Sequence, residues 1–126
     1  MSLPLLVIED EPAVMSFVCR ALERNGYTVV GAKSGSEALE VLAATQVCGI
    51  ISDMRTPGHV DGGGVYRWVK VNRPELANKI VYVTGDIVNE ETVAILKETG
   101  APCVEKPFRM QDLLAVVDQT IGKPQP

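Results

Sequence analysis

The chain has 126 residues, of which 46% are hydrophobic and 22% are charged, with both signs represented. This length suits one domain with a core of its own, and the composition excludes an intrinsically disordered chain. The net charge is −4, and no stripe of Lys or Arg runs along any predicted helix. We therefore expect no nucleic-acid binding by this domain.

Membrane contact by this domain is not expected either, because no apolar run is long enough to span a bilayer. The N-terminus also lacks a basic region followed by a long apolar core. Cys19, Cys48 and Cys103 form no CxxC pair and no metal-ligand spacing. Buried thiols in a reducing, cytoplasmic setting are the expected state of these residues.

Buried strands and amphipathic helices alternate along the chain. The predicted strands, in order, are residues 5–8, 27–30, 47–53, 80–83 and 103–105. The helices between and after them are predicted to begin at Pro12, at the capping box of Ser34, before Val65, at Asn89 and before Leu113. Five strands that alternate with five helices indicate a parallel sheet covered on both faces.

The first predicted helix ends at Asn25-Gly26. Its apolar residues recur at the spacing of one helical face. The residues expected to be buried together are Val14, Phe17, Val18, Ala21 and Leu22.

The predicted fold class is α/β, with a flavodoxin-like (βα)5, doubly wound, five-stranded parallel sheet in the order 2-1-3-4-5. In that order the first and third strands are neighbours, and their carboxyl ends meet at the point where the strand order reverses. Ligands of open α/β sheets bind in the crevice outside those ends.

Three acids are predicted to meet in that crevice. Asp53 ends the apolar run 47–53, and Glu9 and Asp10 directly follow the first strand. Carboxylates this close together repel one another unless a cation binds, and hard oxygen ligands suit Mg²⁺. Two more strand ends supply a hydroxyl, at Thr84, and an ammonium group, at Lys106.

These residue types are the parts needed to receive a phosphoryl group. A divalent metal and the lysine would neutralise the phosphoryl oxygens while Asp53 attacks in line, which would give an acyl phosphate. A helix cap or a turn is the bland alternative for Asp53 taken alone. The four partners at strand ends favour the chemical role.

The sequence resembles the receiver domain of two-component response regulators. The resemblance rests on an ordered set of motifs: Val7-Ile8-Glu9-Asp10-Glu11, Asp53 with Pro57, Asp61-Gly62, Val83-Thr84-Gly85 and Lys106-Pro107-Phe108. It implies that Asp53 is the phosphoacceptor and that Thr84 is the switch hydroxyl. It also implies that Lys106 binds the phosphoryl group and that Glu9, Asp10, Asp53 and the main-chain carbonyl of Arg55 organise Mg²⁺.

The same resemblance implies a phosphohistidine donor on a sensor histidine kinase or a histidine phosphotransfer domain. Phosphorylation and dephosphorylation would be self-catalysed. The receiver is expected to cover residues 4–121, followed by a tail or the start of a linker at 122–126. The motifs look most like receivers of hybrid sensor histidine kinases, so the chain could be the cytoplasmic part of a membrane-bound kinase. A stand-alone regulator and a homodimer both stay open.

Three features depart from the usual pattern of the family. The loop from Pro57 to Asp61 has one residue more than the commonest spacing, and Cys103 stands where an aromatic switch residue is usual. Arg55 and Asp86 are predicted to pair across the mouth of the crevice and to slow hydrolysis of the phosphoryl group. We expect switching to involve Thr84 and the fourth helix without an aromatic partner, or phosphate relay alone.

An inert, receiver-like interaction module is the main alternative function. A phosphatase or phosphomutase would need a second acid where Met54 and Arg55 stand, and a flavin carrier would need a hydroxyl-rich loop after the first strand. His59 has no second histidine to complete a metal site. Gly62-Gly63-Gly64 lacks the lysine of a P-loop and is better explained as a flexible entry to the third helix.

Overall fold

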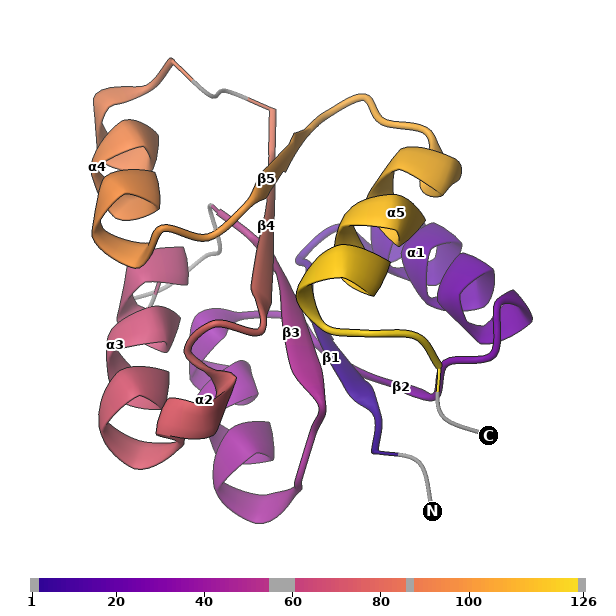
Figure 1. Cartoon of the computed structure of the whole chain (residues 1–126), viewed down its shortest axis with the longest axis horizontal. Helices are drawn as coiled ribbons and strands as arrows, with labels where there is room; N and C mark the ends of the chain where they lie inside the picture. Colours follow the sequence, from indigo (N-terminus) through magenta and orange to yellow (C-terminus); the bar gives the residue numbers. More distant parts are fainter. Residues whose placement is uncertain (1–2, 55–60, 86–87, 125–126) are drawn as a thin grey trace.

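A five-stranded parallel sheet forms the centre of the molecule, with the strand order β2-β1-β3-β4-β5 (Figure 1). The computed structural model describes residues 3–54, 61–85 and 88–124. The strands are β1 (Leu5–Ile8), β2 (Val29–Ala32), β3 (Gly49–Asp53), β4 (Ile80–Thr84) and β5 (Cys103–Glu105). This architecture confirms the predicted fold class and strand order.

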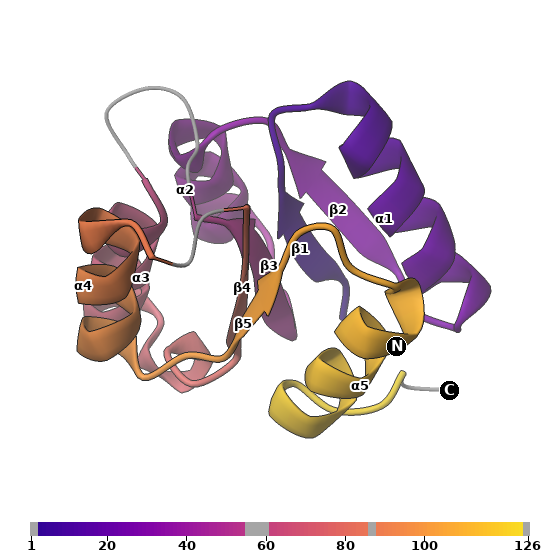
Figure 2. The same cartoon turned by 90° about the horizontal axis from the view of Figure 1, so that it is seen from above.

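Helices cover both faces of the sheet. They are α1 (Pro12–Arg24), α2 (Gly35–Ala44), α3 (Gly62–Asn72), α4 (Glu90–Thr99) and α5 (Met110–Thr120), with a short 3-10 helix, η1 (Pro74–Leu76), after α3. Figures 1 and 2 show α2, α3 and α4 on one face and α1 and α5 on the other. The sheet is therefore doubly wound.

Two apolar cores flank the sheet, because successive residues of a strand point to opposite faces. On the side of α2, α3 and α4, the strands contribute Leu6, Ile8, Ile50, Ile80 and Tyr82. On the side of α1 and α5, they contribute Leu5, Val7, Ile51, Val81, Val83 and Val104. Burial on both sides explains why the strands read as continuous apolar runs.

Local signals set the helix boundaries. Ser34 Oγ accepts a hydrogen bond from the Glu37 amide at 3.1 Å, which begins α2. Asn89 caps α4 in the same way, and Gly100 ends it in the left-handed conformation, with φ of 66°. Asp61 Oδ1 accepts from the Gly64 amide at 2.9 Å, and the triple glycine forms the first turn of α3, where the third helix was predicted to begin.

The predicted buried face of α1 was wrong at Phe17, whose surface is 54% exposed. The residues that pack on the sheet are spaced by four, as Val14, Val18 and Leu22, and are joined by Met15 and Cys19. Phe17 points away from that stripe, since each helical residue is rotated by about 100° from the last. The apolar pattern therefore identified the helix but placed the edge of its buried face incorrectly.

The second strand lies two residues later than predicted. Leu5 of β1 is opposite Val29, and the Leu5 amide donates to Thr28 O at 2.8 Å. Tyr27 lies before β2 and outside the sheet, and its hydroxyl donates to the Gly122 carbonyl at 2.9 Å. The apolar pattern of the sequence does not distinguish Tyr27, which is buried outside the sheet, from Val29, which is part of the strand.

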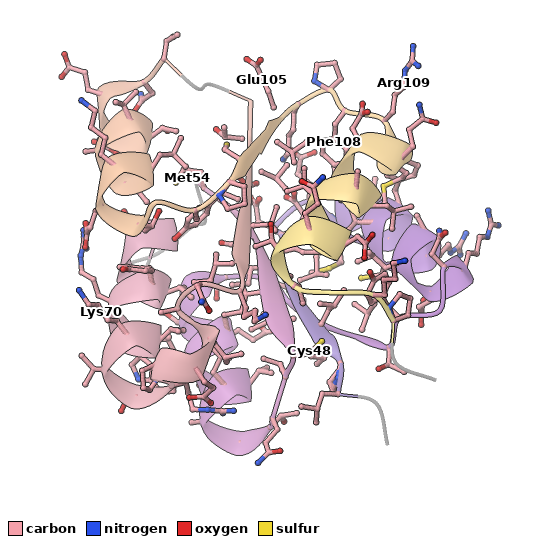
Figure 3. All side chains as sticks on the ribbon, viewed as in Figure 1. Cys48, Met54, Lys70, Glu105, Phe108 and Arg109 are labelled. Carbon is pink, nitrogen blue, oxygen red and sulfur yellow. The ribbon has the colours of Figure 1, made fainter. Side chains whose placement is uncertain are left out.

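The three cysteines are free and half-buried, so the expectation of buried thiols is confirmed only in part. Figure 3 labels Cys48, which lies just before β3 at the lower end of the sheet, and Met54, which follows β3 at the upper end. Among the residues that the structure describes, no helix combines the length and apolar character needed to cross a bilayer.

Candidate functional site

The carboxyl ends of β1 and β3 lie side by side in the middle of the sheet. Ile8 at the end of β1 is opposite Ser52, so the residue after each of them, Glu9 and Asp53, reaches the same edge. The Glu9 amide donates to Ala32 O at 3.0 Å, which holds this end of the chain against β2. The strand order thus brings together two acids that are far apart in the sequence.

Glu9, Asp10 and Asp53 form one acidic cluster. Each offers a carboxylate oxygen, and these oxygens all lie within 4.8 Å of one another. Glu9 is buried, Asp53 is partly buried and Asp10 is exposed. The cluster therefore has a closed side formed by the sheet and an open side toward solvent.

Lys106 supplies a positive charge directly to this cluster. It follows β5, and its amide donates to Thr84 O at 2.7 Å, which fixes the backbone at the end of β4. Its Nζ donates to Glu9 Oε1 at 3.1 Å and to Asp53 Oδ2 at 3.2 Å. In Figure 3, Glu105 and Phe108, which flank Lys106 and Pro107, lie at the upper end of the molecule.

Burial and neighbouring charges shift the pKa values of Glu9 and Lys106. Burial raises the pKa of Glu9, and the charge of Asp53 raises it further. Hydrogen bonds from the Glu11 amide and from Lys106 act in the opposite direction, but the pKa remains above its ordinary value. Burial alone would lower the pKa of Lys106, but the hydrogen bonds and charges of Glu9 and Asp53 outweigh it, so this pKa is raised. Lys106 is therefore a firmly protonated cation between two carboxylates.

Thr84 is the last residue of β4, the strand next to β3, and only 2% of its surface is exposed. Asp53 is opposite Val83, and the Met54 amide donates to Val83 O at 2.9 Å. The ends of β3 and β4 are thus fixed to each other beside the acids. The structure brings Glu9, Asp10, Asp53 and Lys106 into one cluster, and places Thr84 at the neighbouring strand end.

Several sequence predictions fall outside the described residues. They concern the Arg55 carbonyl as a metal ligand, the Arg55–Asp86 pair, the length of the loop from Pro57 and the role of His59. These remain predictions from the sequence.

The residues present fit Mg²⁺. Three carboxylates supply hard oxygen ligands, and the exposed side at Asp10 leaves room for water, which Mg²⁺ usually retains. Glu9, Asp10 and Asp53 are the residues that would hold the ion. Lys106 already pairs with two of them, so the lysine and the metal would share the same carboxylates.

One contributor to the site was missed by sequence reasoning. The Glu11 amide donates to Glu9 Oε2 at 3.1 Å and fixes the buried carboxylate at the start of α1. In the sequence, Glu11 stands out only as the last residue of the motif that follows the first strand, whereas in the structure it is the N-cap residue of α1. No side-chain pattern signals a contribution from a main-chain N–H group.

Comparison with known proteins identifies the family. The model of the response regulator receiver domain matches residues 5–118. The chain therefore belongs to the response regulator receiver domain family of two-component systems.

Two kinds of relatives share this domain. A protein named response regulator MprA from Mycobacterium ulcerans is 35% identical over 115 residues, which are 91% of this chain and 48% of that protein. A protein named sensor kinase CckA from Brucella abortus is 31% identical over 124 residues, which are 97% of this chain but 13% of the kinase. The chain thus spans about half the length of the MprA relatives and a small part of the kinase.

Solved structures agree with this assignment. A CheY-like receiver domain protein from Methanospirillum hungatei superposes with a TM-score of 0.85 at 23% identity, over 96% of this chain and 94% of that one. The signal receiver domain of a histidine kinase from Syntrophus aciditrophicus superposes with a TM-score of 0.83 at 28% identity, over 95% of this chain and 90% of that one. The first similarity shows the fold, and the second agrees with the family as well.

Proposed function

We propose that this receiver domain accepts a phosphoryl group on Asp53 from a phosphohistidine donor, with Mg²⁺ bound by Glu9, Asp10 and Asp53. The observation that carries the proposal is the cluster in which Lys106 Nζ contacts Glu9 at 3.1 Å and Asp53 at 3.2 Å. An aspartate beside a lysine and two more acids at the carboxyl ends of parallel strands is suited to anionic phosphoryl chemistry.

The charges explain why a metal is needed. Three carboxylates and one ammonium group sum to −3 + 1 = −2 when all four are ionised. A phosphoryl group brings further negative oxygens into the same crevice, which this charge would repel. Bound Mg²⁺ would neutralise the excess charge and organise the phosphoryl oxygens.

In the proposed reaction, a carboxylate oxygen of Asp53 attacks phosphorus and forms a P–O bond as the P–N bond of the phosphohistidine breaks. The electron pair of that bond stays on the imidazole nitrogen, which takes up a proton from water. Lys106 moves part of its hydrogen bonding from Asp53 to a phosphoryl oxygen, and the Thr84 hydroxyl donates to another. The donor supplies the energy, while the domain supplies alignment and charge.

The partner would be a sensor histidine kinase or a histidine phosphotransfer domain in the cytoplasm. Residues 4–121 would be the receiver unit, within a stand-alone regulator, a hybrid kinase or a homodimer. The relatives named response regulator and sensor kinase support both larger arrangements. The Arg55 carbonyl would complete the metal ligands, and Arg55 with Asp86 would slow hydrolysis.

The inert interaction module finds no support in the site. A domain that had lost phosphoacceptor chemistry would be free to lose the acids or the lysine, yet Glu9, Asp10, Asp53 and Lys106 are all present and in place. The described residues therefore favour the active receiver.

Incubation with acetyl phosphate and Mg²⁺, followed by intact mass spectrometry, tests the proposal. We expect one added phosphoryl group that is lost on incubation and that requires Mg²⁺. Asp53→Asn should add no mass, whereas the matched surface variant Asp112→Asn, on α5, should behave as the native chain does. Equal labelling of the native chain and Asp53→Asn would contradict the proposed function.

A further inference from the structure

Helices α3 and α4 approach each other closely at Gly63. A Cβ atom added to Gly63 would lie 3.2 Å from Ile95 Cγ1, which is tighter than ordinary van der Waals contact. Gly63 and Ile95 are both buried. The glycine in the first turn of α3 therefore lets the side chain from α4 rest on the helix backbone.

A second contact joins the same helices at the surface. Arg67 donates from Nε to Glu98 Oε2 at 3.0 Å and from Nη2 to Glu98 Oε1 at 2.8 Å. Two parallel bonds of this kind fix direction as well as distance. The pair is exposed, so it contributes little to overall stability, but its geometry ties one helix to the other.

The two contacts are in register. Gly63 and Arg67 are four residues apart on α3, and Ile95 and Glu98 are three apart on α4, so each pair lies on one face of its helix. We call these four residues the α3–α4 clamp. Figures 1 and 2 show the two helices side by side on the same face of the sheet.

Tyr82 shares a core with one member of the clamp, Ile95, and lies on the strand that ends at Thr84. Its side chain is fully buried in the core that also contains Ile95, and it points to the same face of β4 as Thr84, two residues later. Burial raises the pKa of Tyr82, and the charges of Asp61 and Glu98 raise it further while Arg67 opposes them. The phenol is therefore within electrostatic reach of charged groups on both helices.

We propose that α3 and α4 move as one unit, held by the α3–α4 clamp, and that Tyr82 transmits movement of the β4 end at Thr84 to both helices. The inference rests on the proposed function in one respect, namely that phosphorylation of Asp53 starts the movement. It assigns signal transmission to β4, where Tyr82 is directly opposite Cys103 in the sheet. It differs from a switch in which α4 moves alone.

The joint behaviour of the helices is tested first without phosphorylation. In the free protein, amide hydrogen exchange in low urea should give the same opening free energy for residues 62–72 as for 90–99. Glu98→Gln should speed exchange in both segments by about two- to fivefold. The matched variant Glu75→Gln, which breaks the surface pair with Arg73 outside the clamp, should leave both segments unchanged.

Charge reversal gives a sharper test. Arg67→Glu and Glu98→Arg should each loosen both helices, and the double variant should restore the native exchange rates. Failure of the double variant to restore them, or an effect confined to one helix, would overturn the clamp.

The response to phosphorylation is tested with acetyl phosphate and Mg²⁺. Residues 62–72 and 90–99 should change protection together in the native chain. In Tyr82→Leu both changes should shrink, although phosphoryl mass is still added, and in Tyr82→Phe, which keeps the ring, they should persist. A change in 90–99 with none in 62–72 would overturn the inference. Absence of added mass would instead refute the proposed function, and the free-protein exchange would still decide whether the clamp exists.

Discussion

The Lys106 ammonium lies 3.1 Å from Glu9 Oε1, although the two residues are 97 positions apart in the chain. Glu9 is almost fully buried, and Lys106 is the cation that compensates its charge in the structure. The same Nζ contacts Asp53 at 3.2 Å. One lysine therefore stabilises two carboxylates that Mg²⁺ would also use.

Lys106→Met should destabilise the Mg²⁺-free protein by about 1–3 kcal/mol, because a buried carboxylate loses its charged partner. Mg²⁺ should restore more stability to this variant than to the native chain, since it no longer shares its ligands with an ammonium group. Urea unfolding with and without Mg²⁺ measures both effects. Equal stabilisation of the two proteins by Mg²⁺ would contradict competition for the same carboxylates.

Thr84→Val removes a buried hydroxyl while keeping the shape of the side chain. Because a hydrogen bond to a charged oxygen contributes about 1.5–3 kcal/mol, we expect phosphorylation by acetyl phosphate to slow by roughly ten- to a hundredfold. Thr84→Ser keeps the hydroxyl and should remain within a few-fold of the native rate. Phosphorylation rates are compared by intact mass spectrometry. Equal rates for the Val and Ser variants would show that the Thr84 hydroxyl takes no part in phosphorylation.

Gly49→Ala tests the packing at the opposite end of the sheet. A Cβ atom on Gly49 would lie 2.6 Å from Ile121 Cδ1 and Cγ2, so the residue after α5 must shift. We expect a loss of about 1–3 kcal/mol in the free energy of unfolding. Gly85→Ala is the matched control, because no atom of the residues that the structure describes lies within 4 Å of its added Cβ. A loss as large in the control would show that the contact is not the cause.

The cysteine thiols should react slowly in the folded protein. Burial raises the pKa of Cys103, and the charge of Glu105 adds to this effect. A raised thiol pKa means less thiolate at a given pH, so the alkylation rate should rise only at higher pH than in the unfolded chain. Iodoacetamide labelling of folded and urea-unfolded protein across a pH series measures the shift. Identical pH profiles would contradict it.

The sequence predicted most of the fold because its signals were local and mutually consistent. Continuous apolar runs identified the strands, and caps such as Ser34 and Asn89 located the helix starts. The strand order followed from the alternation of elements and the preference for right-handed crossovers. Phe17 was misplaced because the apolar pattern of α1 is wider than the stripe that the sheet covers.

The site was predictable to the extent that strand ends determine it. Glu9, Asp53 and Lys106 each follow or end a strand. The pairing of β1 with β3 brings Glu9 and Asp53 together, and the long side chain of Lys106, which follows β5, reaches both across the end of β4. The Glu11 amide and the contact between Gly63 and Ile95 depend on main-chain positions in three dimensions. Side-chain patterns carry no information on either contact.

The identity of the residue that carries the phosphoryl group tests the central claim most directly. After reaction with acetyl phosphate and Mg²⁺, borohydride reduces an acyl phosphate to an alcohol, which marks the carboxyl group that was phosphorylated. Peptide mass mapping should then locate the reduced residue at Asp53, with Glu9 and Asp10 unmodified. Reduction at Glu9 or Asp10, or no reduction at any carboxyl group, would contradict the account.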